Sequence, residues 1–310
     1  MADEILSRIH REHGEDLLEV LSSRLSPTDL QSLLLEVYRR RALRQAPGRL
    51  LAQHEENRFV RPSPLDPRVR LGFDRVAFSL ASEEFEPIEL APMCPLGTTS
   101  AVTTVSQNNL VSTARNTEVM ADPTNAMALE CALRRRKSPE PVRLCCSERV
   151  TRAQGVSGPQ SWAHFRLFAL VSAGRDEGAY RFESAELARH IGFYLRLFPA
   201  LGFSGMAGVR AALTNFVGDE IAAHHDVLLA DLSAAFPGVE FGHYPERETG
   251  RGYYVGSCFH IYVRDGAGEE YFLADGGVVD WTQKLLSNKK ERFLISGIGT
   301  ERLCSVFGGV

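Results

Sequence analysis

Two glycines followed closely by an arginine stand near the end of this 310-residue chain. Gly297 and Gly299 end an apolar run, and Glu301 and Arg302 follow after Thr300. Glycines let a backbone pass close to a flat or bulky ligand, and the planar guanidinium of arginine suits phosphate groups. The stretch therefore predicts a strand-to-helix turn at which Arg302 grips a phosphate. A turn that binds no ligand is the alternative.

A carboxylate and a hydroxyl stand two residues apart at Asp122 and Thr124, where a helix is expected to open. Either side chain can cap that helix. Together they also offer the acceptors that an ammonium group needs, since that group brings three donors and no acceptor. From these residues alone, helix capping and amine binding both remain open.

A predicted β-hairpin supplies further polar groups. Residues 142–149 have the pattern of a strand, residues 150–161 that of a polar loop, and residues 162–171 that of the returning strand. Six of its residues could contribute to a site, namely Glu148, His164, Phe168, Arg149, Arg152 and Arg166.

In this order, these segments resemble the catalytic core of class II aminoacyl-tRNA synthetases, and most closely the histidyl-tRNA synthetase-like paralogues that lack an anticodon-binding domain. The Gly-x-Gly-x-Glu-Arg stretch matches motif 3, whose arginine lies against ATP. Glu148, His164 and Phe168 match motif 2, in which the glutamate and the loop read adenine and the aromatic ring packs under the base. Asp122 and Thr124 match the acid-x-threonine step that meets the α-amino group of the substrate.

Two further segments resemble histidyl-tRNA synthetase and differ from it in detail. Arg251 precedes the paired tyrosines Tyr253 and Tyr254, at a shorter spacing than in that family. Gly276 and Gly277 resemble the start of a Gly-Gly-Arg-Tyr-Asp motif, but valine follows them in place of arginine.

Motif 2 also departs from the family pattern. Cys146 stands where the family has the arginine that grips the α-phosphate, and a thiol cannot supply that cation. Either another cation of the hairpin (Arg149, Arg152 or Arg166) replaces it, or the site does not form adenylates.

The resemblance implies a site with three groups of residues. The catalytic residues would be Glu148, Arg251 and Arg302. The ATP-binding residues would be Glu148, Arg149, Arg152, His164, Phe168, Gly297, Gly299 and Arg302. The substrate-binding residues would be Asp122, Thr124, Arg166, Tyr253, Tyr254, Gly276 and Gly277.

The implied activity is ATP-dependent activation of an amino-acid-like carboxylate as an adenylate, with Mg²⁺ bridging the phosphates. The acceptor would be a small molecule or a carrier protein, because the chain stops seven residues after Leu303 and leaves no room for an anticodon-binding domain; tRNA is therefore not expected as a partner. The alternatives are a catalytically inactive regulatory subunit of a partner enzyme and a stand-alone aminoacyl-tRNA synthetase.

The expected fold is α+β, with a mostly antiparallel sheet that carries helices on one side and is usually found in a homodimer. A small helical module is expected over residues 1–66, and the synthetase-like core over residues 67–310. Within that core, alternating apolar residues from Val69 to Leu80 predict strands.

The composition is that of an ordinary globular protein, with 44% hydrophobic and 24% charged residues. A net charge of −4 argues against a surface that coats nucleic acid. No apolar run is long enough to cross a membrane, and the N-terminus lacks the pattern of a signal peptide, so we expect a cytoplasmic protein. No pair of the six cysteines has the C-x-x-C spacing, and we expect neither disulfides nor a metal site.

Overall fold

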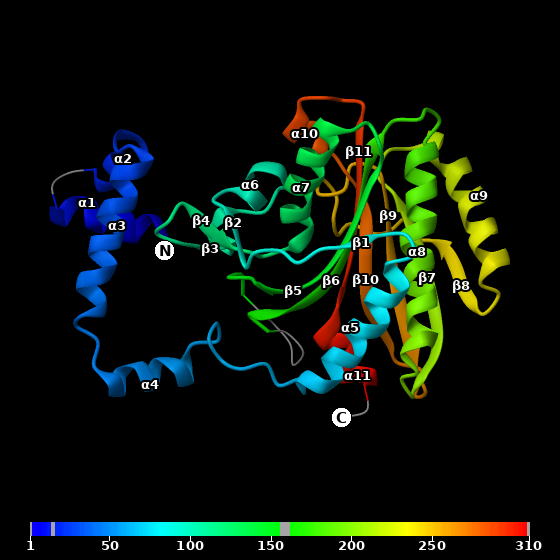
Figure 1. The fold of residues 1–310 in the computed structure, drawn as a ribbon, viewed down its shortest axis with the longest axis horizontal. Helices are drawn as coiled ribbons and strands as arrows, with labels where there is room; N and C mark the ends of the chain where they lie inside the picture. Colours follow the sequence, from blue (N-terminus) through cyan, green and yellow to red (C-terminus); the bar gives the residue numbers. More distant parts are fainter. Residues whose placement is uncertain (1, 14–15, 156–161, 309–310) are drawn as a thin grey trace.

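The computed structural model describes residues 2–13, 16–155 and 162–308. The chain begins with four helices that extend away from the rest of the molecule (Figure 1). Ser26 caps one of them by accepting a hydrogen bond from the Asp29 amide, as its position before Pro27 predicts. These helices are α1 (Ala2–His13), α2 (Leu17–Glu19), α3 (Pro27–Ala42) and α4 (Pro47–Glu56), with a π-helical turn over Val20–Arg24.

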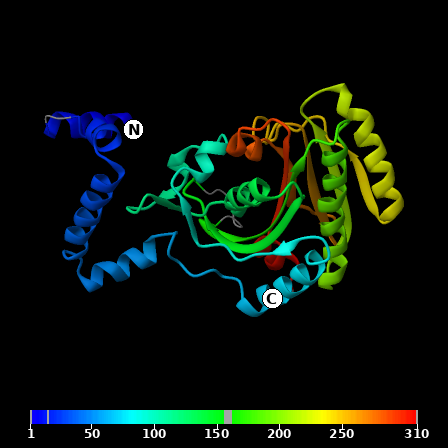
Figure 2. The same ribbon diagram turned by 45° about the horizontal axis from the view of Figure 1, so that its top comes forward.

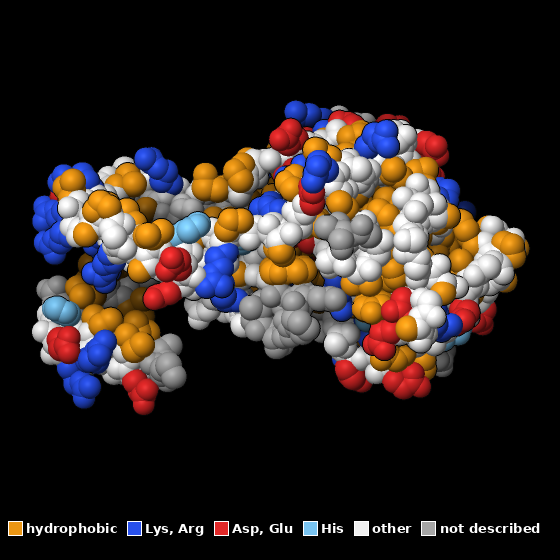
Figure 3. All heavy atoms as spheres, turned by 90° about the horizontal axis from the view of Figure 1, so that it is seen from below, with side chains coloured by type: hydrophobic (Ala, Val, Ile, Leu, Met, Phe, Trp, Pro, Cys, Tyr) orange, Lys and Arg blue, Asp and Glu red, His pale blue; other side chains and the backbone are white. Residues whose placement is uncertain are grey.

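The N-terminal helices bury none of the side chains described between residues 4 and 66. Large apolar side chains are instead exposed, among them Leu43 (75%), Leu51 (62%) and Tyr38 (58%). Figure 3 shows apolar and basic side chains next to one another over this part of the chain. The helical prediction for this region is confirmed, while its boundary at residue 66 as a domain limit stays a prediction.

The strands predicted between Val69 and Leu80 are wrong, because this segment forms helix α5 (Pro67–Ala81). Asp66 caps the helix by accepting from the Arg68 amide, and Pro67 occupies the first turn. Phe73, Ala77 and Ala81 recur every four residues and are fully buried. The buried face of this helix therefore consists partly of alanines. Alanines contribute little to the apolar pattern from which a helix or strand is predicted.

An eight-stranded sheet forms the centre of the molecule, in the order β1-β5-β6-β11-β10-β9-β7-β8. Only the pairs at its two edges, β1 with β5 and β7 with β8, are parallel. This confirms the predicted α+β class with a mostly antiparallel sheet. The strands are β1 (Glu86–Pro87), β5 (Val142–Thr151), β6 (His164–Arg175), β7 (Met206–Asn215), β8 (Val239–His243), β9 (Ser257–Asp265), β10 (Glu270–Val279) and β11 (Glu291–Gly299).

Helices lie on both faces of the sheet, which corrects the expectation of a single helical layer (Figure 2). On one face lie α5, α8 (Arg181–Leu201), α9 (Asp219–Ala235) and α11 (Thr300–Phe307). On the other lie α6 (Thr98–Val102), α7 (Pro123–Lys137) and α10 (Trp281–Leu286). A small three-stranded sheet, β2 (Met93–Pro95), β4 (Thr117–Val119) and β3 (Val111–Ser112), stands beside α6 and α7.

The alternation of side chains along β6 separates two hydrophobic cores. Phe168 and Leu170 pack against α5 and α8, whereas Ala169 and Val171 face α7 and α10. A strand side chain can therefore reach a site on the α7 side only if it points toward that face of the sheet.

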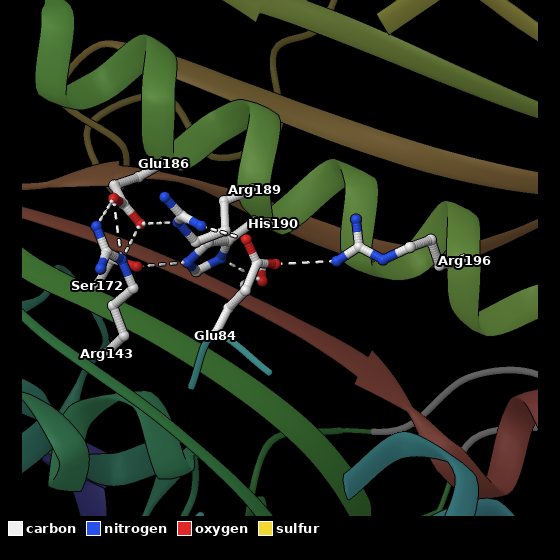
Figure 4. Close-up of polar contacts among 8 residues, drawn as sticks. Glu84, Arg143, Ser172, Glu186, Arg189, His190 and Arg196 are labelled. Carbon is white, nitrogen blue, oxygen red and sulfur yellow. Dashed lines mark hydrogen bonds and ion pairs between the residues drawn. The ribbon is translucent and has the colours of Figure 1, made fainter. Parts of the chain in front are cut away.

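A buried polar network anchors α8 to the back of the sheet (Figure 4). The two ring nitrogens of His190 lie 2.9 Å from Ser172 Oγ of β6 and 2.8 Å from Ser296 Oγ of β11. Glu186, one turn earlier, pairs with Arg143 of β5 at 2.6 Å. Burial lowers the pKa of His190 to about 3, so the ring is neutral and can use one nitrogen as donor and the other as acceptor.

No helix in the described part of the chain has the length and apolar character that crossing a membrane requires.

Candidate functional site

A cavity of about 1130 Å³ opens on the α7 face of the sheet. Its floor comes from β6, β11, β10 and β9, where Gly297 of β11 stands opposite Asp275 of β10. Its walls come from the start of α7, from residues 105–110 and from residues 244–254. A side chain added at Gly297 would point into open space, since its nearest contact is Phe168 O at 3.7 Å. This glycine therefore leaves the centre of the floor uncovered.

The start of α7 brings Asp122 and Thr124 to the cavity wall. Asp122 Oδ1 accepts from the Thr124 amide at 3.0 Å and from its hydroxyl at 2.7 Å, so the carboxylate does cap the helix. Its other oxygen lies 3.3 Å from Arg152 Nη2. The Asp122 side chain is nonetheless 22% exposed. Although it caps the helix, this carboxylate remains partly open to the cavity, so its position allows the predicted contact with an amine.

The start of α11 brings Arg302 to the opposite wall, beside Gly299. Within the part of the chain that the structure describes, the Arg302 guanidinium has no hydrogen bond or ion pair. Its neighbour Glu301 is 3% exposed and accepts from Arg149 Nη2 at 2.7 Å, from the Arg166 amide at 2.9 Å and from Ser63 Oγ at 2.5 Å. Glu301 thus fixes the helix start while Arg302 stays available to a ligand.

Most of the predicted motif 2 residues lie outside the cavity. Glu148 Oε1 accepts from the Leu90 amide at 2.8 Å, and burial raises the pKa of this carboxyl group. Arg149 and Arg166 are committed to Glu301 and to the Ser147 carbonyl. His164 lies 2.9 Å from Arg149 and donates to the Arg61 carbonyl. These side chains hold the hairpin against its neighbours.

Phe168 is the clearest misplacement among the predicted site residues. Its ring is fully buried on the α8 face and stacks on Phe193 with centroids 5.5 Å apart. The contact with a base predicted for Phe168 is therefore wrong. Phe165 lines the cavity instead, and the Arg152 guanidinium lies 5.1 Å from the centroid of its ring. Phe165 shares the face of Leu167 and Ala169, so the strand period of two could have identified it.

Cys146 is fully buried within the core on the α7 face, where burial raises the pKa of its thiol well above the usual value. It therefore supplies no charge to a ligand. Among the three hairpin cations considered as replacements, only Arg152 lines the cavity.

The arginine before the paired tyrosines also differs from the prediction. Arg251 is 55% exposed, lies 3.5 Å from Glu248 and does not line the cavity. Arg247 does line it, with its side chain 2% exposed and Nη2 3.1 Å from Asp275 Oδ1. Tyr253 and Tyr254 line the cavity, and their contact with the substrate stays a prediction. No spacing rule points to Arg247, because its approach depends on how residues 244–254 fold back over β9 and β10.

Gly276 and Gly277 serve close packing. A Cβ at Gly276 would lie 2.5 Å from Ser296 Cβ, and one at Gly277 would lie 2.5 Å from Cys258 Cβ. Neither glycine lines the cavity. Their substrate-binding role is thus not supported by their position, whereas their need to be glycine has a clear steric cause.

Within the described residues, no group of three or more histidine, cysteine or acidic side chains could hold a metal ion. His225, part of the His224-His225-Asp226 run, is 2% exposed and lies 2.6 Å from Ser257 Oγ. All six cysteines are buried and free.

No protein-family model matches the sequence, and no curated protein matches it. Solved structures do match. An ATP phosphoribosyltransferase regulatory subunit/histidyl-tRNA synthetase from Bacillus halodurans superposes with a TM-score of 0.62 at 15% identity, over 81% of this chain and 82% of that one. The apo histidyl-tRNA synthetase of S. aureus gives 0.61 at 14% identity, over 80% and 68% of the two chains. The histidyl-tRNA synthetase of Nostoc sp. PCC 7120 gives 0.58 at 15%, over 81% and 74%. The predicted resemblance is confirmed at the level of fold: the protein contains a class II aminoacyl-tRNA synthetase-like core.

Proposed function

We propose that the cavity binds ATP together with an amino-acid-like substrate and activates the substrate's carboxylate as an adenylate for an acceptor other than tRNA. The observation that carries this proposal is the position of Arg152. It is the hairpin cation that enters the cavity, between Asp122 and Phe165, and it can supply the charge that Cys146 cannot.

The nucleotide would occupy the side of the cavity between Phe165 and Arg302. An aromatic face stabilises a base by stacking, and a guanidinium without a protein partner suits a phosphate. Gly297 and Gly299 allow the ligand to lie close to the backbone of β11. Phe165 takes the role first assigned to Phe168.

The substrate would occupy the side nearer α7. Its ammonium group would meet the Asp122 carboxylate and the Thr124 hydroxyl, with Tyr253 beside them. Its carboxylate would then point toward Arg152. Holding both reactants in one cavity turns an encounter between two molecules into a reaction within one complex.

In the proposed step, a carboxylate oxygen forms a bond to the α-phosphorus of ATP. The bond from that phosphorus to the oxygen bridging the α- and β-phosphates breaks, and pyrophosphate leaves with the electron pair. Arg152 and Arg302 would stabilise the charge spread over the phosphoryl oxygens. Both side chains act by position and charge, with no proton transfer required.

Mg²⁺ would enter as part of the nucleotide substrate, because it is usually held by substrate phosphates, water and only one or two carboxylates. The cavity fits that mode, since single acids such as Glu246 and Asp275 line it. When bound, Mg²⁺ would neutralise phosphate charge.

A second candidate function is a regulatory subunit that binds these ligands without turnover. The burial of Cys146 favours it, because strand β5 then presents no cation to the cavity. One of the structurally similar proteins is named as an ATP phosphoribosyltransferase regulatory subunit. A search for a partner enzyme would therefore test the regulatory function. A homodimer and a cytoplasmic location accompany either function in this proposal.

Amino-acid-dependent exchange of labelled pyrophosphate into ATP tests the first function, across the standard amino acids and pooled metabolites. We expect exchange with one substrate class. Arg302→Gln and Arg152→Gln should each lower it by about a hundredfold, while Arg251→Gln, an exposed control outside the cavity, should leave it unchanged. ATP binding without exchange would favour the regulatory function. An Arg302→Ala variant with unchanged ATP affinity would refute the proposed nucleotide position.

A further inference from the structure

Asn125 has an unusual environment at the start of α7. Its side chain is 2% exposed, and neither its amide oxygen nor its amide nitrogen has a hydrogen-bond partner among the described residues. Because the side-chain oxygen and the side-chain nitrogen both lack a partner, interchanging their positions would not supply a hydrogen bond. Buried amides are nearly always hydrogen-bonded, so this side chain calls for a partner from outside the chain.

The cavity is the source from which such a partner can come, since Asn125 belongs to its lining. The cavity wall also includes the apolar side chains of Val105, Leu110 and Ala121. Thr99, which also lines this wall, is committed to Glu118 through its amide at 3.0 Å. Among the described residues, Asn125 is therefore a polar side chain of the cavity lining that has no protein partner.

Asn125 also lies close to the proposed amine contact. Its backbone N–H donates to the Asp122 carbonyl at 3.3 Å, and Thr124 is the preceding residue. Side chains three residues apart at a helix start are separated by about 5 to 6 Å. This is the reach of a short amino acid between its α-amino group and the end of its side chain.

We propose that Asn125 is a specificity-determining residue that reads the side chain of the amino-acid-like ligand, and that this ligand carries a neutral carboxamide. A carboxamide offers one acceptor and two donors in a plane, which complements the oxygen and nitrogen of Asn125. An apolar side chain of the same size would leave Asn125 unpaired, and a charged one would compete with the ion pair that Asp122 and Arg152 already form. The inference rests on the proposed function and specifies its substrate class.

Calorimetric binding of free amino acids to the full chain, without ATP, tests the proposal. Asparagine and glutamine are compared with leucine and methionine, which have similar sizes and no amide. We expect the amides to bind at least about tenfold more tightly to the wild type, because a site built for hydrogen bonding rejects analogues that leave its groups unpaired. Asn125→Leu should remove this preference, and Asn125→Asp should weaken amide binding by removing two donors. Asn108→Asp, on an exposed neighbouring segment outside the cavity lining, should behave as the wild type.

Thermal unfolding of the same variants adds a measurement that does not depend on any ligand. Replacing an unpartnered buried amide by a group of similar shape should not lower stability, so Asn125→Leu should unfold at or above the wild-type midpoint. A clear drop would show that Asn125 has a partner within the protein and would overturn the inference. Equal binding of amides and apolar amino acids would overturn it too, while leaving amino-acid binding intact. Failure of every amino acid to bind would overturn the proposed function itself.

Discussion

Arg149 Nη2 lies 2.7 Å from Glu301 Oε1 and joins the end of β5 to the start of α11. The contact connects the two segments that resemble motifs 2 and 3, yet it lies on the face of the sheet away from the cavity. Arg149 therefore stabilises the start of α11 against β5 without lining the cavity. The same carboxylate receives the Arg166 amide and Ser63 Oγ, so residues far apart in the chain meet at Glu301.

Glu301→Gln should lower the free energy of unfolding by about 1 to 3 kcal/mol. The substitution keeps the size of the side chain but weakens charge-assisted hydrogen bonds, and its partner Arg149 is 36% exposed, so solvent screens part of the loss. Urea denaturation would measure the change. Glu83→Gln, at an exposed site, is the control and should change stability by much less. Equal effects of the two substitutions would mean that Glu301 does not hold α11 in place.

Phe165 and Phe168 stand three residues apart on β6 and should respond to substitution in opposite ways. Phe168→Ala should cost about 3 to 5 kcal/mol of stability, because it opens a cavity among Phe73, Phe78 and Phe193. Phe165→Ala should cost less stability and weaken nucleotide binding, since its ring lines the cavity. Denaturation curves and ATP titrations of both variants separate the two roles. Loss of ATP binding by a folded Phe168→Ala variant, with Phe165→Ala unaffected, would restore the original assignment.

The elements with strong local cues were predictable from the sequence. The start of α7 follows from Asp122 before Pro123, and the β5–β6 hairpin from two apolar runs around a polar loop. Helix α5 was not, because Val69, Leu71 and Phe73 also alternate. The structure leaves Leu71 56% exposed and buries Ala77, so the true apolar stripe uses small residues that a strand pattern ignores.

The site was predictable only where a family motif and the local geometry agree. Gly297, Gly299 and Arg302 reach the cavity because a strand runs directly into a helix there. Arg247 was missed, since its approach to Asp275 depends on a loop whose path no local pattern encodes. Asn125 was missed as well, because its lack of a hydrogen-bond partner among the described residues becomes apparent only after folding.

The cysteines should react slowly with thiol reagents in the folded protein. All six are buried, and burial raises the pKa of Cys131, Cys145, Cys258 and Cys304 to about 12. The reactive thiolate is therefore scarce at neutral pH. Labelling followed by intact-mass analysis should show little modification until denaturant is added, and then six labels. Rapid labelling of one cysteine under native conditions would contradict its described burial.

Cys146→Arg tests whether the missing motif 2 cation can be restored. The thiol is fully buried in the core, so an arginine there would be both too large and without a counter-charge. We expect a loss of stability of more than about 3 kcal/mol and no gain in pyrophosphate exchange. Cys146→Ala is the control, with a smaller loss. A stable Cys146→Arg protein with faster exchange would show that the side chain turns into the cavity.

Below about pH 6.5, the free energy of unfolding should decrease as the pH falls, and part of this decrease should come from His190. Burial lowers its pKa from 6.5 to about 3, so between these values the unfolded chain binds a proton that the folded chain does not. Stability from this group is thus fully present above pH 6.5 and is lost as the pH falls toward 3, at about 1.4 kcal/mol per pH unit. His190→Gln can keep contacts to Ser172 and Ser296 while removing the titration, so its denaturation midpoints between pH 4.5 and 7 should depend less steeply on pH than those of the wild type. His54→Gln, in the exposed helix α4, should retain the wild-type slope. Identical slopes for His190→Gln and the wild type would mean that His190 can be protonated within the fold, and that the network between β6 and β11 tolerates a charge.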